Sequence, residues 1–141
     1  MDYSTPEKLK KNNSLKNKKI LIVEDNEINR EIVIEALTIL GMNIESASNG
    51  KEAVEIINNC QDGEYDAVLM DIEMPVMNGY DAVKAIRASD RAYLKNVPVI
   101  AISAYSAEED VEEYRKAGMN GHITKPMTFD EVVRVLLEVS A

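Results

Sequence analysis

Five polar residues with complementary chemistry stand directly after short apolar runs of this 141-residue chain. Glu24 and Asp25 follow the run 20–23, Asp71 follows 67–70, Ser103 follows 97–102, and Lys125 follows 121–124. Carboxylates gathered in one partly dry site repel each other strongly, so a cation is expected among them. Hard oxygen ligands without histidine or cysteine suit Mg²⁺, which commonly shares a phosphate with its protein ligands.

The lysine and the serine supply what an incoming anion needs. Lys125 cannot neutralise three acids by itself, so its ammonium is better suited to meet a negatively charged ligand, and the Ser103 hydroxyl offers a proton to the same ligand. A metal, a lysine and a hydroxyl around a carboxylate favour phosphoryl transfer, because that transition state needs charge neutralisation and alignment more than covalent chemistry. The residue types therefore predict a phosphoryl-transfer site, provided that the fold brings the apolar runs together.

The apolar runs alternate with stretches of helical period, which predicts five strand and helix units. The expected strands are 20–23, 43–47, 67–70, 97–102 and 121–124, and the expected helices are 27–40, 49–59, 80–88, 106–117 and one from about residue 128. This alternation predicts an α/β fold with a doubly wound parallel sheet, because each right-handed crossover places a helix on a sheet face. Ligands of such sheets bind beyond the carboxyl ends of the strands, so the acidic ends converge if 20–23 neighbours 67–70.

Local signals refine these elements. The helix 27–40 is expected to carry one apolar stripe, formed by Ile28, Ile32, Ala36 and Leu40, and to end at Gly41. Helix starts are expected at three capping pairs, namely Asn49 with Glu52, Ser106 with Glu109, and Thr128 with Glu131. Gly79 is expected to serve a turn with a positive φ.

Length, composition and charge narrow the class of protein. The chain is long enough for one domain with a single core, and its only cysteine, Cys60, fits a reducing cytosol and a cytoplasmic location. No apolar segment is long enough to span a membrane, and the polar N-terminus is not that of a signal peptide. Of the total charge of −9, residues 1–19 carry +4 and residues 20–141 carry −13. We therefore expect no direct nucleic-acid binding, a flexible basic tail or linker over 1–17, and a folded domain over 18–141.

Four strings extend this interpretation to a family. In order and spacing, ILIVEDN, VLMDIEMPVMNG, VIAISA and ITKPM resemble the receiver domain of two-component response regulators over about residues 18–141. The resemblance implies a flavodoxin-like (βα)5 sheet of order 2-1-3-4-5. It also implies a phospho-accepting protein that catalyses its own phosphotransfer and dephosphorylation and is not otherwise an enzyme. The phosphoryl donor would be a histidine kinase or a histidine phosphotransfer protein, and the output would be a downstream protein target.

The resemblance also assigns roles to individual residues. Asp71 would accept the phosphoryl group, while Glu24, Asp25, Asp71 and the backbone carbonyl of Glu73 would hold Mg²⁺ or Mn²⁺. Ser103 and Lys125 would contact phosphoryl oxygens, and Pro126 would follow a cis peptide bond. Phosphorylation would then draw Ser103 inward and change the face formed by helix 106–117, strand 121–124 and the last helix.

Two positions depart from the commonest family pattern, and two others are expected to tune the site. His122 stands at the usual aromatic switch position, and Glu24 stands where aspartate is more common. Glu73 and Tyr105 lie two residues after Asp71 and Ser103 and are expected to control water access and thus the lifetime of the phosphorylated state. The strings EDNEINR and GMNGHITKP resemble receivers of hybrid sensor histidine kinases, and the sequence leaves open whether the chain is a stand-alone regulator or part of such a kinase.

Two other functions are compatible with the same residues. One is a phosphatase with an aspartate nucleophile that acts on small phosphoesters. The pattern of such enzymes has a second aspartate two residues after the nucleophile, and this chain has Glu73 at that position. The other is a receiver-like docking module that is never phosphorylated. A phosphatase assay and a metal titration would separate these alternatives.

Overall fold

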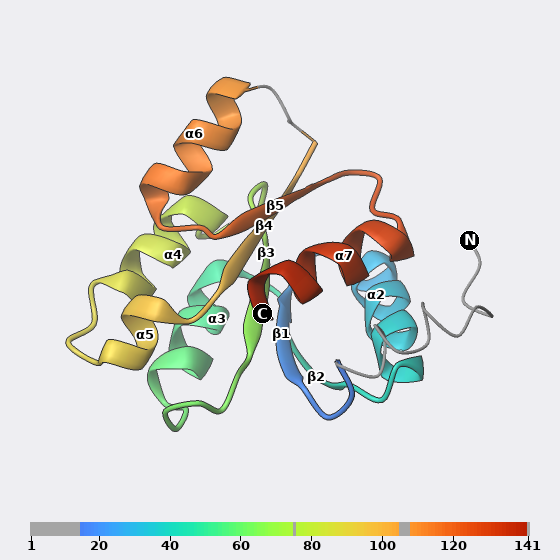
Figure 1. The fold of residues 1–141 in the computed structure, drawn as a ribbon. Helices are drawn as coiled ribbons and strands as arrows, with labels where there is room; N and C mark the ends of the chain where they lie inside the picture. Colours follow the sequence, from blue (N-terminus) through green and yellow to red (C-terminus); the bar gives the residue numbers. More distant parts are fainter. Residues whose placement is uncertain (1–14, 75, 105–107, 141) are drawn as a thin grey trace.

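The computed structural model describes residues 15–74, 76–104 and 108–140. Its five strands are β1 (Lys19–Val23), β2 (Asn43–Ala47), β3 (Ala67–Asp71), β4 (Val99–Ser103) and β5 (Gly121–Thr124). They form one parallel sheet in the order β2-β1-β3-β4-β5 (Figure 1). The predicted fold class and strand order are thus confirmed.

Helices cover both faces of the sheet. They are α2 (Glu27–Ile39), α3 (Gly50–Asn58), α4 (Gly79–Arg87), α5 (Ala92–Asn96), α6 (Glu108–Ala117) and α7 (Phe129–Ser140). In Figure 1, α2 and α7 lie on one side of the sheet, and the other four helices lie on the opposite side. Each layer has its own apolar cluster, with Leu37 and Leu136 in one and Ile57 and Ile86 in the other. Because both faces are covered, β1, β3 and β4 are almost continuously buried and almost entirely apolar.

Helix starts agree with the expected caps where the structure describes them. The Asn49 side chain accepts a hydrogen bond from Glu52 N at 2.8 Å, and the Glu52 carboxylate accepts one from the Ser48 hydroxyl at 2.8 Å. Thr128 Oγ1 accepts a hydrogen bond from Glu131 N at 3.2 Å. Each cap satisfies a backbone donor that has no partner within its helix. The expected cap at Ser106 lies outside the described residues.

The apolar stripe expected on α2 is wrong at Ile28 and Ile32, whereas its last member, Leu40, packs against the core as expected. Ile28 and Ile32 are 70% and 60% exposed, whereas Val33 and Leu37 are buried against the sheet. Two apolar stripes run along this helix about a quarter turn apart, so helical period alone does not select the one that faces the core. Packing against β1 and the neighbouring α7 decides in favour of Val33 and Leu37.

The segment before β4 also differs from expectation. The short helix α5 was not predicted, and β4 begins at Val99 and includes Ser103, whereas the expected strand was 97–102. Val97 N donates a hydrogen bond to Tyr93 O at 2.8 Å and therefore belongs to the end of α5. Pro98 follows, and its carbonyl accepts from Val68 N at 2.8 Å at the entry to the sheet.

Gly79 has a different role from the one predicted. It begins α4, and the positive φ in this loop belongs to Val76, at 71°. A Cβ atom on Gly79 would lie 2.6 Å from the Asp71 carbonyl oxygen. Because Gly79 has no side chain, α4 can start directly against the carboxyl end of β3, next to Asp71.

The described chain begins with a residue that packs into the core. Leu15 is 1% exposed, and Asn17 N donates a hydrogen bond to Gly41 O at 2.9 Å. Residues 15–17, which were assigned to the expected tail, are thus in contact with the folded part of the chain. Among the described residues, no helix has both the length and the apolar character needed to cross a bilayer.

Candidate functional site

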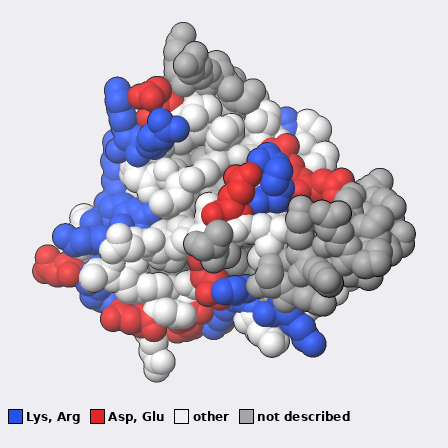
Figure 2. Space-filling view, in the orientation of Figure 1, with Lys and Arg blue, Asp and Glu red and all other residues white. Residues whose placement is uncertain are grey.

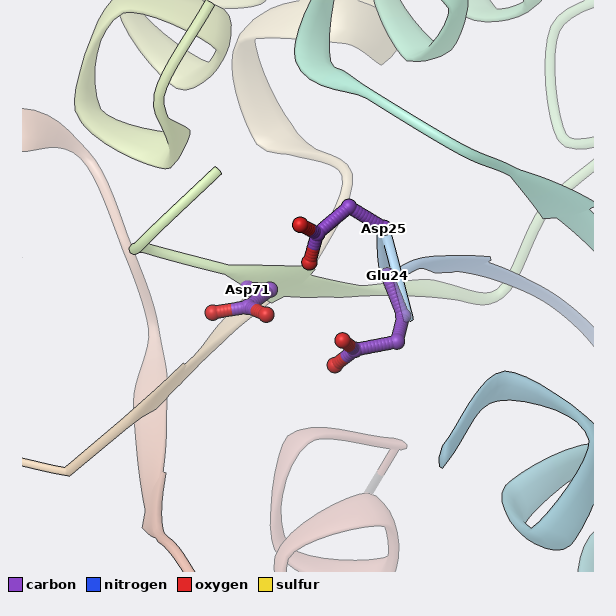
Figure 3. Close-up of side chains that lie close together, drawn as sticks. All are labelled: Glu24, Asp25 and Asp71. Carbon is purple, nitrogen blue, oxygen red and sulfur yellow. The ribbon is translucent and has the colours of Figure 1, made fainter. Parts of the chain in front are cut away.

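Three carboxylates meet at the carboxyl ends of β1 and β3. Glu24 and Asp25 follow β1, and Asp71 is the last residue of β3, which pairs directly with β1. Their side chains point toward one another, and one carboxylate oxygen from each lies within 4.8 Å of the others (Figure 3). Glu24 and Asp71 are 2% and 1% exposed, while Asp25 is open to solvent. The adjacency of β1 and β3 thus produces the expected acidic cluster.

Glu24 is the electrostatically unusual member of the cluster. Its Oε1 accepts a hydrogen bond from Asn26 N at 3.1 Å, whereas its buried Oε2 has no partner among the described residues. Burial and the nearby charge of Asp71 raise the pKa of Glu24 to about 7. An oxygen without a partner, beside two further carboxylates and with no histidine or cysteine in the group, fits a hard divalent cation such as Mg²⁺.

Lys125 approaches the cluster from the end of β5. Its Nζ donates to both carboxylate oxygens of Asp71, each at 3.1 Å. The peptide bond between Lys125 and Pro126 is cis, as expected, and Lys125 N donates to Ser103 O at 2.8 Å, which ties this residue to the end of β4. Burial raises the pKa of Asp71, and the hydrogen bond from Lys125 opposes this shift without cancelling it. Burial alone would lower the pKa of Lys125, but its contacts with Asp71 raise it overall.

Ser103 and Glu73 complete the group of predicted residues that the fold brings together. Ser103 is 1% exposed, and its Oγ donates a hydrogen bond to Glu73 Oε1 at 2.9 Å. The other Glu73 oxygen lies 3.9 Å from Lys125 Nζ, and Glu73 N donates to Asp71 Oδ1 at 3.1 Å. The Glu73 side chain therefore lies between the hydroxyl and the ammonium that were expected to meet an anion.

The two remaining predicted residues have different outcomes. Tyr105 lies outside the described residues. His122 is on β5, half-buried, with its ring centroid 5.9 Å from that of Tyr114. Tyr114, on α6, is 3% exposed, and burial raises the pKa of its hydroxyl. Sequence reasoning missed the contact between these two rings, because nothing in the sequence relates a tyrosine in one helix to a histidine on the following strand.

Comparison with known proteins agrees with this geometry. Residues 20–137 match the family described as the response regulator receiver domain. A curated relative, the osmosensing histidine protein kinase SLN1 of Saccharomyces cerevisiae, is 35% identical over 126 residues, which cover 87% of this chain and 10% of that kinase. The chain spans 5% to 15% of the length of the histidine kinases that it matches.

Two solved structures share the fold. One is the receiver domain of a sensor histidine kinase from Pseudomonas aeruginosa with a magnesium ion coordinated in the active site cleft, at a TM-score of 0.77 and 35% identity over 89% of this chain and 99% of that one. The other is the receiver domain of Ssk1 in complex with the histidine phosphotransfer protein Ypd1 from Saccharomyces cerevisiae, at a TM-score of 0.78 and 29% identity over 89% of this chain and 90% of that one. The family match over most of the chain, together with the acidic cluster at the strand ends, shows that this chain belongs to the receiver domains of two-component signalling, which normally act as phosphoacceptors.

Proposed function

We propose that Asp71 accepts a phosphoryl group from a phosphohistidine on a partner protein and that this modification changes the binding of a downstream protein. One observation carries the proposal. Asp71 is buried at a strand end, among carboxylates that fit a divalent cation, and Lys125 Nζ lies 3.1 Å from both of its oxygens. A carboxylate held in this way is oriented and has its charge compensated before any donor arrives.

The proposed transfer is a displacement at phosphorus. A carboxylate oxygen of Asp71 forms a bond to phosphorus while the bond from phosphorus to the histidine nitrogen breaks, and the electron pair of that bond goes to the imidazole, which takes up a proton. Lys125 and Ser103 then contact oxygens of the bound phosphoryl group. Water later attacks the same phosphorus, releases inorganic phosphate and regenerates the Asp71 carboxylate. Because Glu73 lies beside this path, its side chain is expected to affect the rate of hydrolysis.

The metal site of the proposal consists of Glu24, Asp25, Asp71 and the backbone carbonyl of Glu73, which would hold Mg²⁺ or Mn²⁺. The bound cation would neutralise charge that develops on the phosphoryl oxygens during transfer. Two observations support this assignment. Glu24 Oε2 has no hydrogen-bond partner among the described residues, and the related receiver from Pseudomonas aeruginosa holds a magnesium ion in its active site cleft. Glu24 itself must lose its proton to act as a ligand, so the metal competes with a proton near neutral pH.

A protein donor is favoured by the apolar surface beside the site. A groove next to the cluster is lined by Glu24, Asn29, Ile32, Val33, Lys125, Pro126 and Met127. Ile28 and Ile32 project from the first turns of α2 into solvent at 70% and 60% exposure. A small phosphoester needs no such surface, whereas a protein that presents a phosphohistidine can cover it. The complex of the related Ssk1 receiver with Ypd1 gives an example of such a partner.

The direct test is labelling by acetyl phosphate in the presence of Mg²⁺, followed by intact mass. We expect the native chain to gain the mass of one phosphoryl group and Asp71→Asn to gain none. Asp81→Asn, which changes an exposed acid in the first turn of α4, is the matched control and should be labelled normally. Full labelling of Asp71→Asn would refute the assignment, and rapid turnover of p-nitrophenyl phosphate by the native chain would favour a phosphatase.

A further inference from the structure

Arg30 of α2 binds the backbone at the start of the loop that carries Glu24 and Asp25. Its Nη1 donates a hydrogen bond to the Glu24 carbonyl oxygen at 2.8 Å, and the residue is half-buried. Arg30 N also donates to Asn26 O at 2.9 Å, at the first turn of the helix. Both the main chain and the side chain of Arg30 are therefore anchored to the segment between β1 and α2.

The Glu24 carbonyl needs this donor because the sheet ends beside it. Glu24 N donates to Ala47 O at 3.1 Å, and the N–H and C=O groups of one residue in a strand point to the same side. Ala47 is the last residue of β2, and the chain then turns toward α3, whose N-cap is Asn49. The ladder between β1 and β2 ends at this point, so the hydrogen bond to the Glu24 carbonyl comes from Arg30 instead of a strand.

This hydrogen bond holds the peptide unit that joins the two acids. The carbonyl of Glu24 and the N–H of Asp25 belong to one planar peptide group, so a donor on the carbonyl restrains the backbone rotation on both sides. In Figure 3 the side chains of Glu24 and Asp25 leave the chain in different directions, and both turn toward Asp71. The Glu24 carboxylate is also held by Asn26 N, whereas Asp25 is open to solvent and takes its direction from the backbone.

We propose that Arg30 is a positioning residue of the metal site, which directs the carboxylates of Glu24 and Asp25 toward Asp71 by holding the Glu24 carbonyl. This inference rests on the proposed function, to which it adds a residue outside the set that would hold the metal. Replacing a residue that orients metal ligands typically lowers the affinity for the metal by about 10-fold to 100-fold. Arg30 is therefore expected to matter for Mg²⁺ binding although it offers the metal no ligand atom.

The positive charge of Arg30 makes the sign of the effect informative. A guanidinium beside a cation site repels the cation, so if Arg30 acted through its charge alone, its removal would strengthen Mg²⁺ binding. If Arg30 positions the ligands, its removal weakens Mg²⁺ binding, because the peptide unit between Glu24 and Asp25 is then free to rotate. The two roles thus predict changes of opposite sign in the dissociation constant for Mg²⁺.

The experiment titrates the metal-free native chain, Arg30→Ala and Arg134→Ala with MgCl₂ and follows their amide resonances. We expect Arg30→Ala to raise the dissociation constant for Mg²⁺ by about 10-fold or more. Arg134→Ala removes the same charge from α7, where basic and acidic side chains lie side by side on the surface (Figure 2) and Arg134 pairs with Glu138 at 3.0 Å. This control should change the constant by less than about 2-fold, because salt screens a distant exposed charge.

The native chain allows a second measurement that needs no substitution. If the hydrogen bond to the Glu24 carbonyl forms in solution, the guanidinium protons of Arg30 should exchange with water more slowly than those of Arg134, whose ion pair is exposed to solvent. This comparison tests the contact directly, even if Arg30→Ala fails to fold. Matching amide spectra without metal show whether both alanine variants are folded.

The outcomes separate the two proposals. If the native chain binds no Mg²⁺, the metal site of the proposed function fails, and the role of Arg30 falls with it. If the native chain binds Mg²⁺ and Arg30→Ala binds it equally well or more tightly, Arg30 does not position the ligands, while the proposed function stands. An equal loss of affinity in Arg134→Ala, or Arg30 protons that exchange as fast as those of Arg134, would overturn the inference in the same way.

Discussion

Glu24 and Asp25 are neighbours in the sequence, but their environments differ in a way that governs the electrostatics of the site. Asp25 is open to solvent, whereas Glu24 is 2% exposed and has one oxygen without a partner among the described residues. Burial penalises the charged form, so the pKa of Glu24 rises from the ordinary 4.5 to about 7. The same carboxylate that suits a cation therefore holds a proton near neutral pH when no cation is bound.

This shift predicts a pH dependence of the metal-free protein. Between pH 4.5 and about 7 the folded state binds more protons at Glu24 than the unfolded chain does, so this residue makes the free energy of unfolding fall as the pH rises. Relative to Glu24→Gln, the native chain should lose on the order of 2 to 3 kcal/mol between pH 5 and pH 8. Urea unfolding in EDTA measures this difference between the two proteins.

Magnesium provides the internal check on this prediction. Because a cation binds the ionised carboxylates of the folded state, Mg²⁺ should stabilise the native chain more at pH 8 than at pH 5. If the free energy of unfolding changes with pH in the same way for the native chain and for Glu24→Gln, with or without the metal, then the pH dependence does not come from Glu24.

Among the elements, the extent of α2 was predicted correctly, but the apolar side chains that its first turns bury were predicted wrongly. Its start at Glu27 and its end near Gly41 follow from local signals, since the Asn26 side chain caps the first turn and Gly41 adopts a φ of 81°. The direction of its apolar stripes depends instead on the sheet and on α7. As a result, Ile28, Ile32 and Ile39 are exposed, and Ile32 lines the groove at the site.

The exposed stripe of α2 predicts a difference between two similar substitutions. Ile32→Ala should slow phosphotransfer from a phosphohistidine protein by about 5-fold to 30-fold, because it removes apolar area that the donor would cover. Ile39→Ala is the matched control, since Ile39 is 78% exposed at the other end of the same helix. Both variants should react normally with acetyl phosphate, and alanine is favourable in a helix, so neither should unfold the protein.

Transfer kinetics with phosphorylated Ypd1 as the donor, set against labelling by acetyl phosphate, measure the effect. Equal rates for the two variants with the protein donor would show that the start of α2 is not a docking surface.

Over the whole molecule, two apolar layers enclose the sheet, and a residue from before the first strand belongs to one of them. Leu15 packs into the layer that contains Leu37 and Leu136 and is 1% exposed. The composition of the N-terminal segment, which is rich in lysine and asparagine, gave no sign of this. The packed part of the chain thus includes residue 15, which precedes the first expected strand.

Leu15 predicts a large effect of a substitution outside the expected domain. Leu15→Ala should lower the free energy of unfolding by about 2 to 4 kcal/mol, the usual range for a buried leucine. Lys16→Ala, at the exposed neighbouring position, should change it by about 0.5 kcal/mol or less. Chemical unfolding of the two variants compares them directly, and a Leu15→Ala protein as stable as Lys16→Ala would show that residue 15 is not part of the core in solution.

The sequence by itself determined the five strands, their order through the family resemblance, and the chemistry of Glu24, Asp25, Asp71, Ser103 and Lys125. These features depend on local backbone preferences and on the rule that parallel strands deliver their carboxyl ends to one edge. The tertiary structure alone decided which apolar residues of α2 are buried, where the missing side chain of Gly79 matters, that Ser103 donates to Glu73, and that Tyr114 lies against His122. Such contacts join residues from different elements, so they depend on the distances and angles at which the helices pack, which no local pattern of residues encodes.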